Sequence, residues 1–403
     1  ASSGGDERRP ALEGVRILEF GWNWAGPMCG QLLADMGAEV IRIETEKRQD
    51  EMRFRDFASW FFCNTNRSKL STTINVAGEE GAALVRELAA KSDIVVDNLA
   101  AGVMARNGLG YEDLRKVKED LIVVSMSMAG QEGPERGLRG FASIATAASG
   151  LELMIGYPED ETSTGLLTFG LGDTTVAVQG TIAVLAALDH RDRTGEGQFV
   201  DVSQIDAAVA TLAEPLLEYQ LSGEVAGPQG NRHPTHFPHG LYPAAGDDRW
   251  LAVAVTTTEE WAGLARVLGR GEWADEPSLA SAEGRRRVGD DVDAAISDWT
   301  ASQARDAAVK ALWAEGVPAA PLLELPERDS HPQFGTRGFI WDHTAEGWDP
   351  CFVYGTPWLL DATPAEMRRP APLLGEHNEY VWKDLLGLGD SEIERLRESG
   401  VLG

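Results

Sequence analysis

Short apolar runs alternate with amphipathic stretches over the first third of the chain, and this alternation restricts the fold more than any other feature. The apolar, strand-like runs occupy residues 15–20, 39–44, 70–76, 93–97 and 121–125. Helical stretches separate them, including one that opens at Pro27 and stops at Gly37, and another over 78–91. Strands that alternate with helices in this way build parallel sheets with helices on both faces. We therefore expect an α/β fold with a doubly wound sheet.

The chain beyond residue 140 has a different pattern. A long apolar helix is expected over 173–193, followed by a strand at 198–202 and a helix at 203–221. Residues 222–240 are rich in glycine, proline and histidine, which is typical of loops. The next segments predict a second, smaller domain with a hairpin over 241–255, helices near 258–269 and 302–315, and a strand at 319–325.

The composition argues against several classes of protein. The apolar content of 43% suits a folded chain, and no run of 18 apolar residues predicts a membrane span. Asp and Glu number 64 against 36 Lys and Arg, so the net charge of −28 repels nucleic-acid phosphates. Cys29, Cys63 and Cys351 are too few and scattered for a disulfide framework, which favours a reducing, cytoplasmic location. No histidine lies near these cysteines in the sequence. We therefore expect the three cysteines to be packed as apolar side chains and not to act as nucleophiles.

Asp173 is the candidate catalytic residue. It stands in the segment Gly170-Leu171-Gly172-Asp173-Thr174-Thr175, immediately ahead of the long apolar helix. One interpretation is structural, because aspartate is a favoured N-cap residue. The other is chemical, because a carboxylate held ionised at a helix N-terminus is a competent nucleophile toward an activated acyl group. The residues by themselves leave both interpretations open.

Two further motifs carry weaker signals. The first turn, GWNWAGP, and Glu44 at the end of the next strand occupy the place of a dinucleotide site. The turn lacks the GxGxxG glycines, so we do not expect NAD to bind. The loop His233-Pro234-Thr235-His236-Phe237-Pro238-His239 has metal-like spacing, but its two prolines disfavour convergence of three ligands. A shaped loop near a pocket is the favoured interpretation, and no metal is expected.

Arginines provide the remaining candidates for binding. Arg42, Arg67, Arg106 and Arg139 fall at or near the ends of predicted elements. Each one separately is interpreted as a solvated charge. Together they could build the basic pocket that an anionic cofactor needs in so acidic a chain.

Several segments, taken in order, resemble the class III CoA-transferase family (CaiB/BaiF type), which includes formyl-CoA transferase, carnitine CoA-transferase and α-methylacyl-CoA racemase. The segments are LEGVRILEF, AGP, LLADMGAEVIRIE, NRSK, DIVVDNLAAGVMARNGLGYEDL, GQEGP, LGDTT, LAALDHRDRTGEGQFVDVSQIDA, PAPLLGEHNEYV and LLGL. They cover residues 12–221 and 331–403 in the order in which the family has them. Each motif is modest, whereas the ordered set is specific.

This resemblance implies an unusual architecture. A Rossmann-like large domain is built from both ends of the chain, a smaller α+β domain is inserted, and two protomers interlock like rings. The implied parts are a disordered N-terminus (1–10), the large CoA-binding domain (11–221), the small domain (222–330) and a C-terminal segment that returns to the large domain (331–403). A homodimer is expected, and a heteromer with a paralogous subunit is the alternative.

The resemblance also implies the site. The family's nucleophile lies in the pair that is here Gly172-Asp173. Coenzyme A or acyl-CoA is the expected substrate. The CoA-contacting positions map onto Asn23, Trp24, Ile74, Asn98, Leu99, Arg106 and Arg139.

The sequence departs from the family at two positions that bear on CoA. Thr45 and Ala77 stand where the family commonly has basic residues. The contact with the adenine-side phosphate is therefore expected to be weaker, or rebuilt from Lys47, Arg48 or Arg67.

The expected activity is transfer of CoA from an acyl-CoA, with succinyl-CoA as the preferred candidate, to a carboxylic acid through aspartyl anhydride and aspartyl-CoA thioester intermediates. Water must be excluded from such intermediates, and the Trp22/Trp24 turn and the loop 231–240 are candidate shields. A racemase is one alternative, opposed by Phe141-Ala142 in place of the racemases' His-Asp pair. A second alternative is a non-catalytic subunit, which the presence of the Gly172-Asp173 pair opposes. A third is a nicotinamide oxidoreductase, which the missing glycine fingerprint opposes.

Overall fold

The computed structural model describes residues 9–54, 58–158 and 170–403, which divide into two compact units. The larger unit takes its residues from the ranges Ala1–Glu152, Leu167–Glu224 and Pro332–Gly403, and the smaller from Leu153–Leu166 and Val225–His331. Of the N-terminal segment 1–10, which the sequence predicts to be disordered, all residues except Arg9 and Pro10 lie outside the described ranges.

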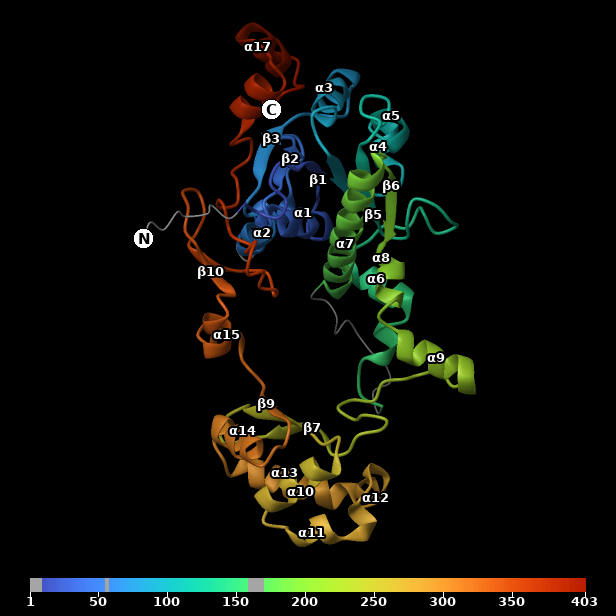
Figure 1. Ribbon diagram of the computed structural model, residues 1–403, viewed down its shortest axis with the longest axis vertical. Coiled ribbons are helices and arrows are strands. Elements are labelled where there is room, and N and C mark those ends of the chain that lie inside the picture. The colour runs from blue at the N-terminus through green and yellow to red at the C-terminus, as the bar shows by residue number, and fades with distance from the viewer. Residues whose placement is uncertain (1–8, 55–57, 159–169) are drawn as a thin grey trace. The chain divides into compact units, whose positions relative to one another are not determined.

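A six-stranded parallel sheet forms the centre of the larger unit (Figure 1). Its strands lie in the order β3–β2–β1–β4–β5–β6, which is the order of the doubly wound dinucleotide-binding folds. The strands are β1 (Arg16–Phe20), β2 (Glu39–Glu44), β3 (Leu70–Thr73), β4 (Ile94–Asp97), β5 (Ile122–Ser127) and β6 (Phe199–Ser203). Ile17 of β1 pairs with Val40 of β2 on one side and with Ile94 of β4 on the other. The predicted α/β fold is confirmed.

Alternate residues of these strands enter two separate cores. Leu18, Ile41 and Val95 belong to the core on one face, and Ile17 and Val40 to the core on the other. All of these side chains are buried. Burial on both faces explains why the strands read in the sequence as nearly continuous apolar runs.

The helices of the larger unit up to residue 222 are α1 (Ala25–Asp35), α2 (Ala58–Asn66), α3 (Glu79–Ala89), α4 (Val103–Arg106), α5 (Tyr111–Leu114), α6 (Ala142–Ser149), α7 (Leu171–Thr194), α8 (Gln204–Val209) and α9 (Ala213–Ser222). Two predictions are wrong in detail. Helix α1 begins at Ala25, so Pro27 lies inside its first turn. The single helix expected over 203–221 is two helices, α8 and α9.

Helix α7 is the long apolar helix of the chain. By length and composition it is the one helix in the described ranges that could cross a membrane. It packs against α1, α8 and strand β5. A Cβ atom at Gly180 would come within 2.4 Å of the Met126 sulfur, so this glycine lets the helix approach the sheet closely. Such packing is that of a core helix, and it fixes the start of α7 relative to the sheet.

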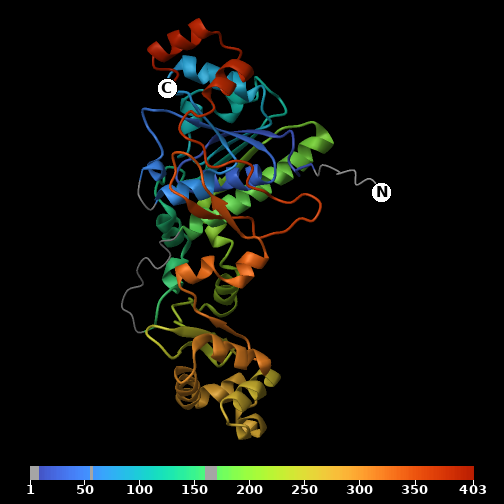
Figure 2. The same cartoon turned by 90° about the vertical axis from the view of Figure 1, so that its left-hand side faces the viewer.

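The C-terminal part of the chain completes the larger unit. It contains α16 (Pro332–Thr336), the antiparallel pair β10 (Ile340–His343) and β11 (Cys351–Tyr354), a π-helical segment (Tyr380–Leu385) and α17 (Asp390–Glu398). Helix α17 lies beside α3 in both views (Figures 1 and 2), and Arg395 pairs with Glu80 at 2.6 Å. Ile393 and Leu396 enter the same core as Leu18.

The smaller unit has its own sheet and core. Its antiparallel sheet has the order β7–β8–β9, and the expected hairpin around Gly246 is confirmed by the pairing of β7 with β8. Trp261, Leu264 and Ile296 are fully buried in the core. The elements are β7 (His239–Pro243), β8 (Trp250–Ala254), α10 (Thr258–Val267), α11 (Glu272–Asp275), α12 (Ala282–Arg287), α13 (Gly289–Ala301), α14 (Arg305–Ala314), β9 (Ala319–Pro321) and α15 (Leu325–Asp329).

Candidate active site

The turns that follow β1 and β4 meet at the edge of the sheet where ligands bind in folds of this kind. Strands β1 and β4 are neighbours although β2 and β3 lie between them in the sequence, so the strand order reverses here. The Trp22 amide N–H donates to Asn98 Oδ1 at 2.8 Å, and Asn98 Nδ2 donates to the Trp22 carbonyl at 2.9 Å. The Asn98 amide therefore ties the two turns together.

Asn23 is held in an unusual conformation in the first turn. Its φ of 58° lies in the left-handed region, which is costly for most residues but tolerated by asparagine. Its amide N–H donates to Asp50 Oδ2 at 3.1 Å, and Arg42 Nη2 donates to the same oxygen at 2.6 Å. The Asn23 Oδ1 atom is buried and has no hydrogen-bond partner among the residues that the structure describes. An unsatisfied buried acceptor is rare and points to a donor that a ligand supplies.

A cavity of about 290 Å³ opens at these turns, and we call it the Asp173 cavity. The residues that line it include Trp22, Asn23, Asn98, Leu99, Arg139 and Asp173. With Arg48, Met126 and Gln204 also in its lining, the cavity gathers residues from seven separate segments of the sequence.

A second cavity of about 580 Å³, the Ile74 cavity, shares Trp22, Arg48 and Leu99 with the first. Ile74 and Lys47 also line it. Thr45 and Ala77, which stand in place of basic residues of the family, line this cavity too. Its size is within the range of pockets that hold cofactors.

Gly170 sets the start of the helix that carries Asp173. It is the N-cap of α7, with φ of 71°. A Cβ atom at this position would lie 2.4 Å from the Trp24 ring, so both the backbone conformation and the packing require glycine. Asp173 is consequently the third residue of α7, and the N-cap interpretation of Asp173 is wrong.

The Asp173 carboxylate is partly buried and is held by one neutral partner. Gln204 Nε2 donates to Asp173 Oδ1 at 2.9 Å. Burial raises the pKa of Asp173 to about 6, and the hydrogen bond from Gln204 opposes that rise. Burial disfavours the charged form, and a single amide only partly compensates. The group is therefore largely ionised at neutral pH and retains the reactivity of a poorly solvated carboxylate.

Gln204 is a site residue that the sequence analysis missed. It is the first residue of α8, directly after β6, and only 6% of it is exposed. The carboxyl ends of parallel strands share one edge of a sheet, so the end of β6 was a place to search. The sequence does not show which polar residue of this turn faces Asp173.

The structure brings together most of the CoA-contacting positions that the resemblance implied. Asn23, Asn98, Leu99 and Arg139 line the Asp173 cavity, and Ile74 lines the second cavity. Trp24 and Arg106 are not among the residues that line either cavity. The Trp24 ring packs edge-on against Phe61 with centroids 4.2 Å apart, and Arg106 Nη1 donates to the Ala101 carbonyl at 3.4 Å.

The four arginines do not form one basic pocket, so that prediction is wrong: Arg42 lines the Ile74 cavity and Arg139 the Asp173 cavity, whereas Arg67 and Arg106 line neither. Arg42 is buried, and its guanidinium pairs at 3.3, 3.2 and 2.6 Å with Glu19, Glu44 and Asp50. Arg67 is also buried and pairs with Asp35 at 2.8 Å. Both therefore neutralise charges inside the protein. Of the basic residues proposed to rebuild the phosphate contact, Lys47 and Arg48 do line the Ile74 cavity, and Arg67 is not among its lining residues.

Glu44 illustrates the same buried network. Burial opposes its ionisation, but Arg42 and Arg53 outweigh that effect and lower the pKa of Glu44 to about 2. Arg53 donates to its two carboxylate oxygens at 3.1 and 2.6 Å, and Ser71 donates at 2.7 Å. Glu44 thus anchors the protein's own arginines and is not free to hold a ribose.

The histidine loop belongs to the smaller unit. His233 stacks on His236 with ring centroids 4.3 Å apart, and its Nδ1 accepts the backbone N–H groups of Thr235 and His236 at 3.2 Å. Within the described ranges, only one group brings three potential metal ligands together. It consists of Cys63, His343 and Cys351, whose ligand atoms lie within 4.8 Å of one another.

The doubly wound sheet has a cavity at its switch point, and a carboxylate at the start of a core helix lines that cavity. These features are typical of an α/β enzyme. The model of CoA-transferase family III matches residues 12–378, and the chain therefore belongs to this family. The curated relatives of this family that match the chain are CoA-transferases, enzymes for which acyl-CoA is a substrate. The resemblance described from the sequence is confirmed.

Similar proteins agree with this assignment. A succinyl-CoA–D-citramalate CoA-transferase from Chloroflexus aurantiacus is 33% identical over 97% of this chain and 98% of its own length. The alpha subunit of a succinyl-CoA–L-malate CoA-transferase from the same organism is 33% identical over 99% of this chain and 94% of its own. The crystal structure of a CAIB/BAIF family protein from Brucella suis has a TM-score of 0.84 and 28% identity, covering 93% of this chain and 99% of that one.

Proposed function

We propose that this chain transfers CoA from an acyl-CoA donor to a carboxylic acid, with Asp173 as the nucleophile. One observation carries the proposal: the Asp173 carboxylate lines a cavity at the switch point of the sheet, next to Asn23, Asn98 and Leu99. Gln204 fixes Oδ1, and we assign the attack to the other carboxylate oxygen.

The reaction then proceeds through two kinds of acyl intermediate. The Asp173 carboxylate attacks the donor thioester, a mixed anhydride forms and CoA thiolate leaves. The thiolate attacks the Asp173 carbonyl, which releases the donor acid and gives an aspartyl-CoA thioester. The acceptor carboxylate attacks this thioester to form a second anhydride, and the thiolate then attacks the acceptor carbonyl. The product is the acceptor's CoA thioester, and the Asp173 carboxylate is regenerated.

The two cavities suit the two ends of the acyl-CoA. We assign the acyl group and the thioester to the Asp173 cavity, and the nucleotide part to the Ile74 cavity, where Lys47 and Arg48 supply positive charge. Asn23, Ile74, Asn98, Leu99 and Arg139 are the contacts we assign from lining positions. We also assign Trp24 and Arg106 to the CoA site, although neither lines either of the two cavities. Trp24 packs against Gly170, the N-cap of α7. The Trp22/Trp24 turn, which lies in the same unit as the cavities, is assigned to exclude water.

Succinyl-CoA is the proposed donor. Both relatives described above carry succinyl-CoA in their names and match this chain over nearly its full length. The racemase alternative requires a second proton-transfer group close to Asp173. Phe141, which lines the Asp173 cavity and is 70% exposed, offers none.

We also propose an interlocked homodimer, with a heteromer as the alternative because one relative is named an alpha subunit. Exposed apolar side chains on α7 and α9 support a partner surface: Ile182 is 61% exposed, Leu217 57% and Leu221 87%. The two compact units support the domain boundaries near 222 and 331, but they group Leu153–Leu166, which lies within the proposed large domain 11–221, with the small domain 222–330. A cytoplasmic location rests on the sparse cysteines.

The experiment is mass spectrometry of the purified chain after incubation with a panel of acyl-CoAs and no acceptor. We expect succinyl-CoA to give an aspartyl-CoA adduct on the peptide that contains Asp173. Acetyl-CoA serves as the non-dicarboxylate comparison, and the isosteric Asp173→Asn variant is the matched control. An adduct that persists in Asp173→Asn, or one located on another residue, would show that the assignment of the nucleophile is wrong.

A further inference from the structure

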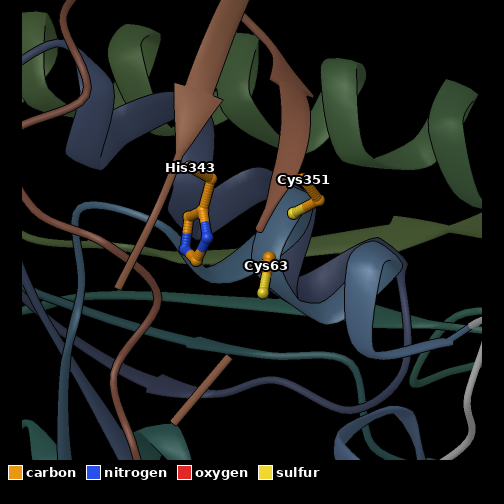
Figure 3. A group of neighbouring side chains, drawn as sticks. All are labelled: Cys63, His343 and Cys351. Atoms are coloured by element: carbon orange, nitrogen blue, oxygen red, sulfur yellow. The ribbon is translucent and has the colours of Figure 1, made fainter. Parts of the chain in front are cut away.

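A cluster of two cysteines and one histidine lies in the larger unit, outside the residues that line the Asp173 cavity (Figure 3). Cys63 belongs to α2, His343 is the last residue of β10 and Cys351 is the first residue of β11. His343 and Cys351 are directly paired across the two antiparallel strands. Their ligand atoms and the Cys63 sulfur all lie within 4.8 Å of one another.

Several contacts dock β11 onto α2 and so fix the positions of the two sulfurs. The Tyr354 N–H donates to Asn64 Oδ1 at 2.9 Å, and Arg67 Nη2 donates to the Tyr354 carbonyl at 2.7 Å. Phe62 stacks on Trp348 with centroids 5.3 Å apart. The cysteines, which are distant in the sequence, are thus neighbours because the C-terminal segment returns to α2.

The hydrogen bonding of His343 determines which nitrogen carries its proton. The Ala371 N–H donates to His343 Nε2 at 3.0 Å, so Nε2 presents its lone pair and Nδ1 carries the proton. His343 is fully buried, and it contributes a hydrogen bond to the Cys351 sulfur. The nitrogen left to face the sulfurs is therefore a donor.

This tautomer does not fit a metal ion. A metal ligand must offer a lone pair, but His343 Nδ1 can do so only if the proton moves to Nε2. That proton would then oppose the N–H of Ala371. A donor that faces two sulfurs fits a thiolate instead.

The neighbouring groups place the thiolate on Cys351. A hydrogen bond from the Cys63 thiol lowers the pKa of Cys351, His343 lowers it further, and burial and Asp342 oppose them. The same bond, together with burial, raises the pKa of Cys63, and Arg53 opposes that rise only in part. Cys351 is also partly exposed, whereas only 1% of Cys63 is exposed. The ionised sulfur is thus the one that a solute can reach.

We propose that Cys351 and Cys63 form a modification site for hydroperoxides, in which Cys351 is the attacking sulfur and Cys63 closes a disulfide between β11 and α2. The Cys351 thiolate attacks the terminal peroxide oxygen. An S–O bond forms, the O–O bond breaks, and the alkoxide or hydroxide leaves and takes a proton from water. The sulfur has then given two electrons to the peroxide and is a sulfenic acid.

The second step follows from the loss of charge. A neutral sulfenic acid no longer raises the pKa of Cys63, so the Cys63 sulfur attacks the Cys351 sulfur. An S–S bond forms, the S–O bond breaks, and the hydroxide leaves as water with the Cys63 proton. A reducing thiol reverses the modification. This chemistry does not involve Asp173, so it stands or fails separately from the proposed transferase mechanism.

The test treats the full chain with hydrogen peroxide and maps its cysteines by mass spectrometry without reduction. We expect the intact mass to fall by two hydrogen atoms and a Cys63–Cys351 linked peptide to appear, both reversed by dithiothreitol. Cys29 is the internal control, because it is fully buried and burial raises its pKa to about 12. Iodoacetamide near pH 6 should alkylate Cys351 at least about tenfold faster than Cys29.

Three variants and a matched control separate the roles. Cys351→Ser should abolish the reaction, and Cys63→Ser should stop it at a sulfenic acid that dimedone traps on Cys351. His343→Gln should slow the alkylation of Cys351 severalfold. Cys29→Ser should behave as the unmodified chain. Equal alkylation of Cys29 and Cys351 in the unmodified chain would overturn the proposal. Retention of one zinc ion per reduced chain, lost in Cys63→Ser, would also overturn it.

Discussion

The Asp173 carboxyl and the Cys351 thiol are two acids in partly buried settings, and their pKa values move in opposite directions. For Asp173 burial is the main influence, and the single amide of Gln204 leaves the pKa raised to about 6. For Cys351 the hydrogen bond from Cys63 is the main influence, and with His343 it outweighs burial. The number and charge of donors around an acid therefore decide the direction of the shift.

The comparison assigns different chemistry to the two regions. A carboxylate with one neutral donor is poorly stabilised and suits attack on an acyl group. A thiol with two donors ionises at a lower pH than an ordinary cysteine, and its thiolate suits reaction with an oxidant. Changes in one region should therefore leave the chemistry of the other region intact.

The largest effect is expected for Asp173→Asn. Removal of the nucleophile should lower kcat for CoA transfer by roughly 10⁴-fold or more, while CoA binding by calorimetry is retained. The free energy of unfolding at pH 7 should not fall, because an ionised Asp173 in this site costs stability. Peroxide should still link Cys63 to Cys351. Near-normal turnover in this variant would remove Asp173 from the mechanism.

The next largest effect, on the free energy of unfolding, is expected from removing the buried Arg42 guanidinium, which pairs with three carboxylates. Arg42→Met leaves the carboxylates of Glu19, Glu44 and Asp50 buried without their shared partner. Loss of one partner from a buried ion pair should lower the free energy of unfolding by about 3–5 kcal/mol, measured with denaturant. Arg193→Met, which breaks an exposed pair with Asp189, is the control and should cost about 1 kcal/mol or less.

Gln204→Leu should sharpen the comparison by removing the one side-chain donor that, among the described residues, opposes the shift in the pKa of Asp173. A hydrogen bond to a charged group contributes about 1.5–3 kcal/mol, which corresponds to roughly one to two pH units. The acid limb of the rate profile for transfer should therefore move to higher pH. A profile that keeps its midpoint, with only a lower plateau, would contradict this role of Gln204.

The pH dependence of the unmodified chain follows from the same shift. Because Asp173 must be ionised to attack, kcat/KM should fall about tenfold per pH unit below pH 6. Alkylation of Cys351 should change little between pH 7 and pH 6 and fall only below about pH 5, because the pKa of Cys351 is lowered to about 5. The free energy of unfolding changes in the opposite direction. Because the pKa of Asp173 is raised in the folded state, its contribution lowers the free energy of unfolding as the pH rises from about 4 through 6. Below about pH 4 the contribution is absent.

The smallest effect is expected for Cys29→Ser. Cys29 is buried between α1 and α7 and accepts a hydrogen bond from Thr181 at 3.5 Å. We expect transfer activity and disulfide formation to remain within about twofold of the unmodified chain, because the sulfur belongs to neither region. Loss of either activity would mean that Cys29 takes part in it.

The sequence predicted the sheet well because strands buried on both faces are continuous apolar runs. Strand β2 was predicted at its observed bounds, and the others within a few residues. Helix α2 was not predicted, since Ala58–Asn66 has neither an apolar stripe at helical spacing nor a recognisable cap. Tertiary packing against β11 stabilises this helix, and such packing is not visible in local sequence.

The site was only partly predictable. Asp173 was a candidate from its place ahead of the long helix and from the family motifs, and Asn23 and Asn98 came from the family motifs alone. The structure places all three on one cavity. Gln204 and the pairing of Cys63 with Cys351 depend on long-range folding, which no local pattern encodes. The buried partners of Arg42 and Arg67 were likewise missed, because sequence does not distinguish a solvated arginine from one that neutralises buried carboxylates.

Oxygen exchange at Asp173 tests the central claim most directly. The chain is incubated with succinyl-CoA and an acceptor acid whose carboxylate carries ¹⁸O, and the peptide containing Asp173 is weighed after turnover. Attack by the acceptor on the aspartyl-CoA thioester leaves one acceptor oxygen on the Asp173 carboxylate, so we predict that the label appears there. Rapid formation of the acceptor's CoA thioester with no label on Asp173 would contradict the account.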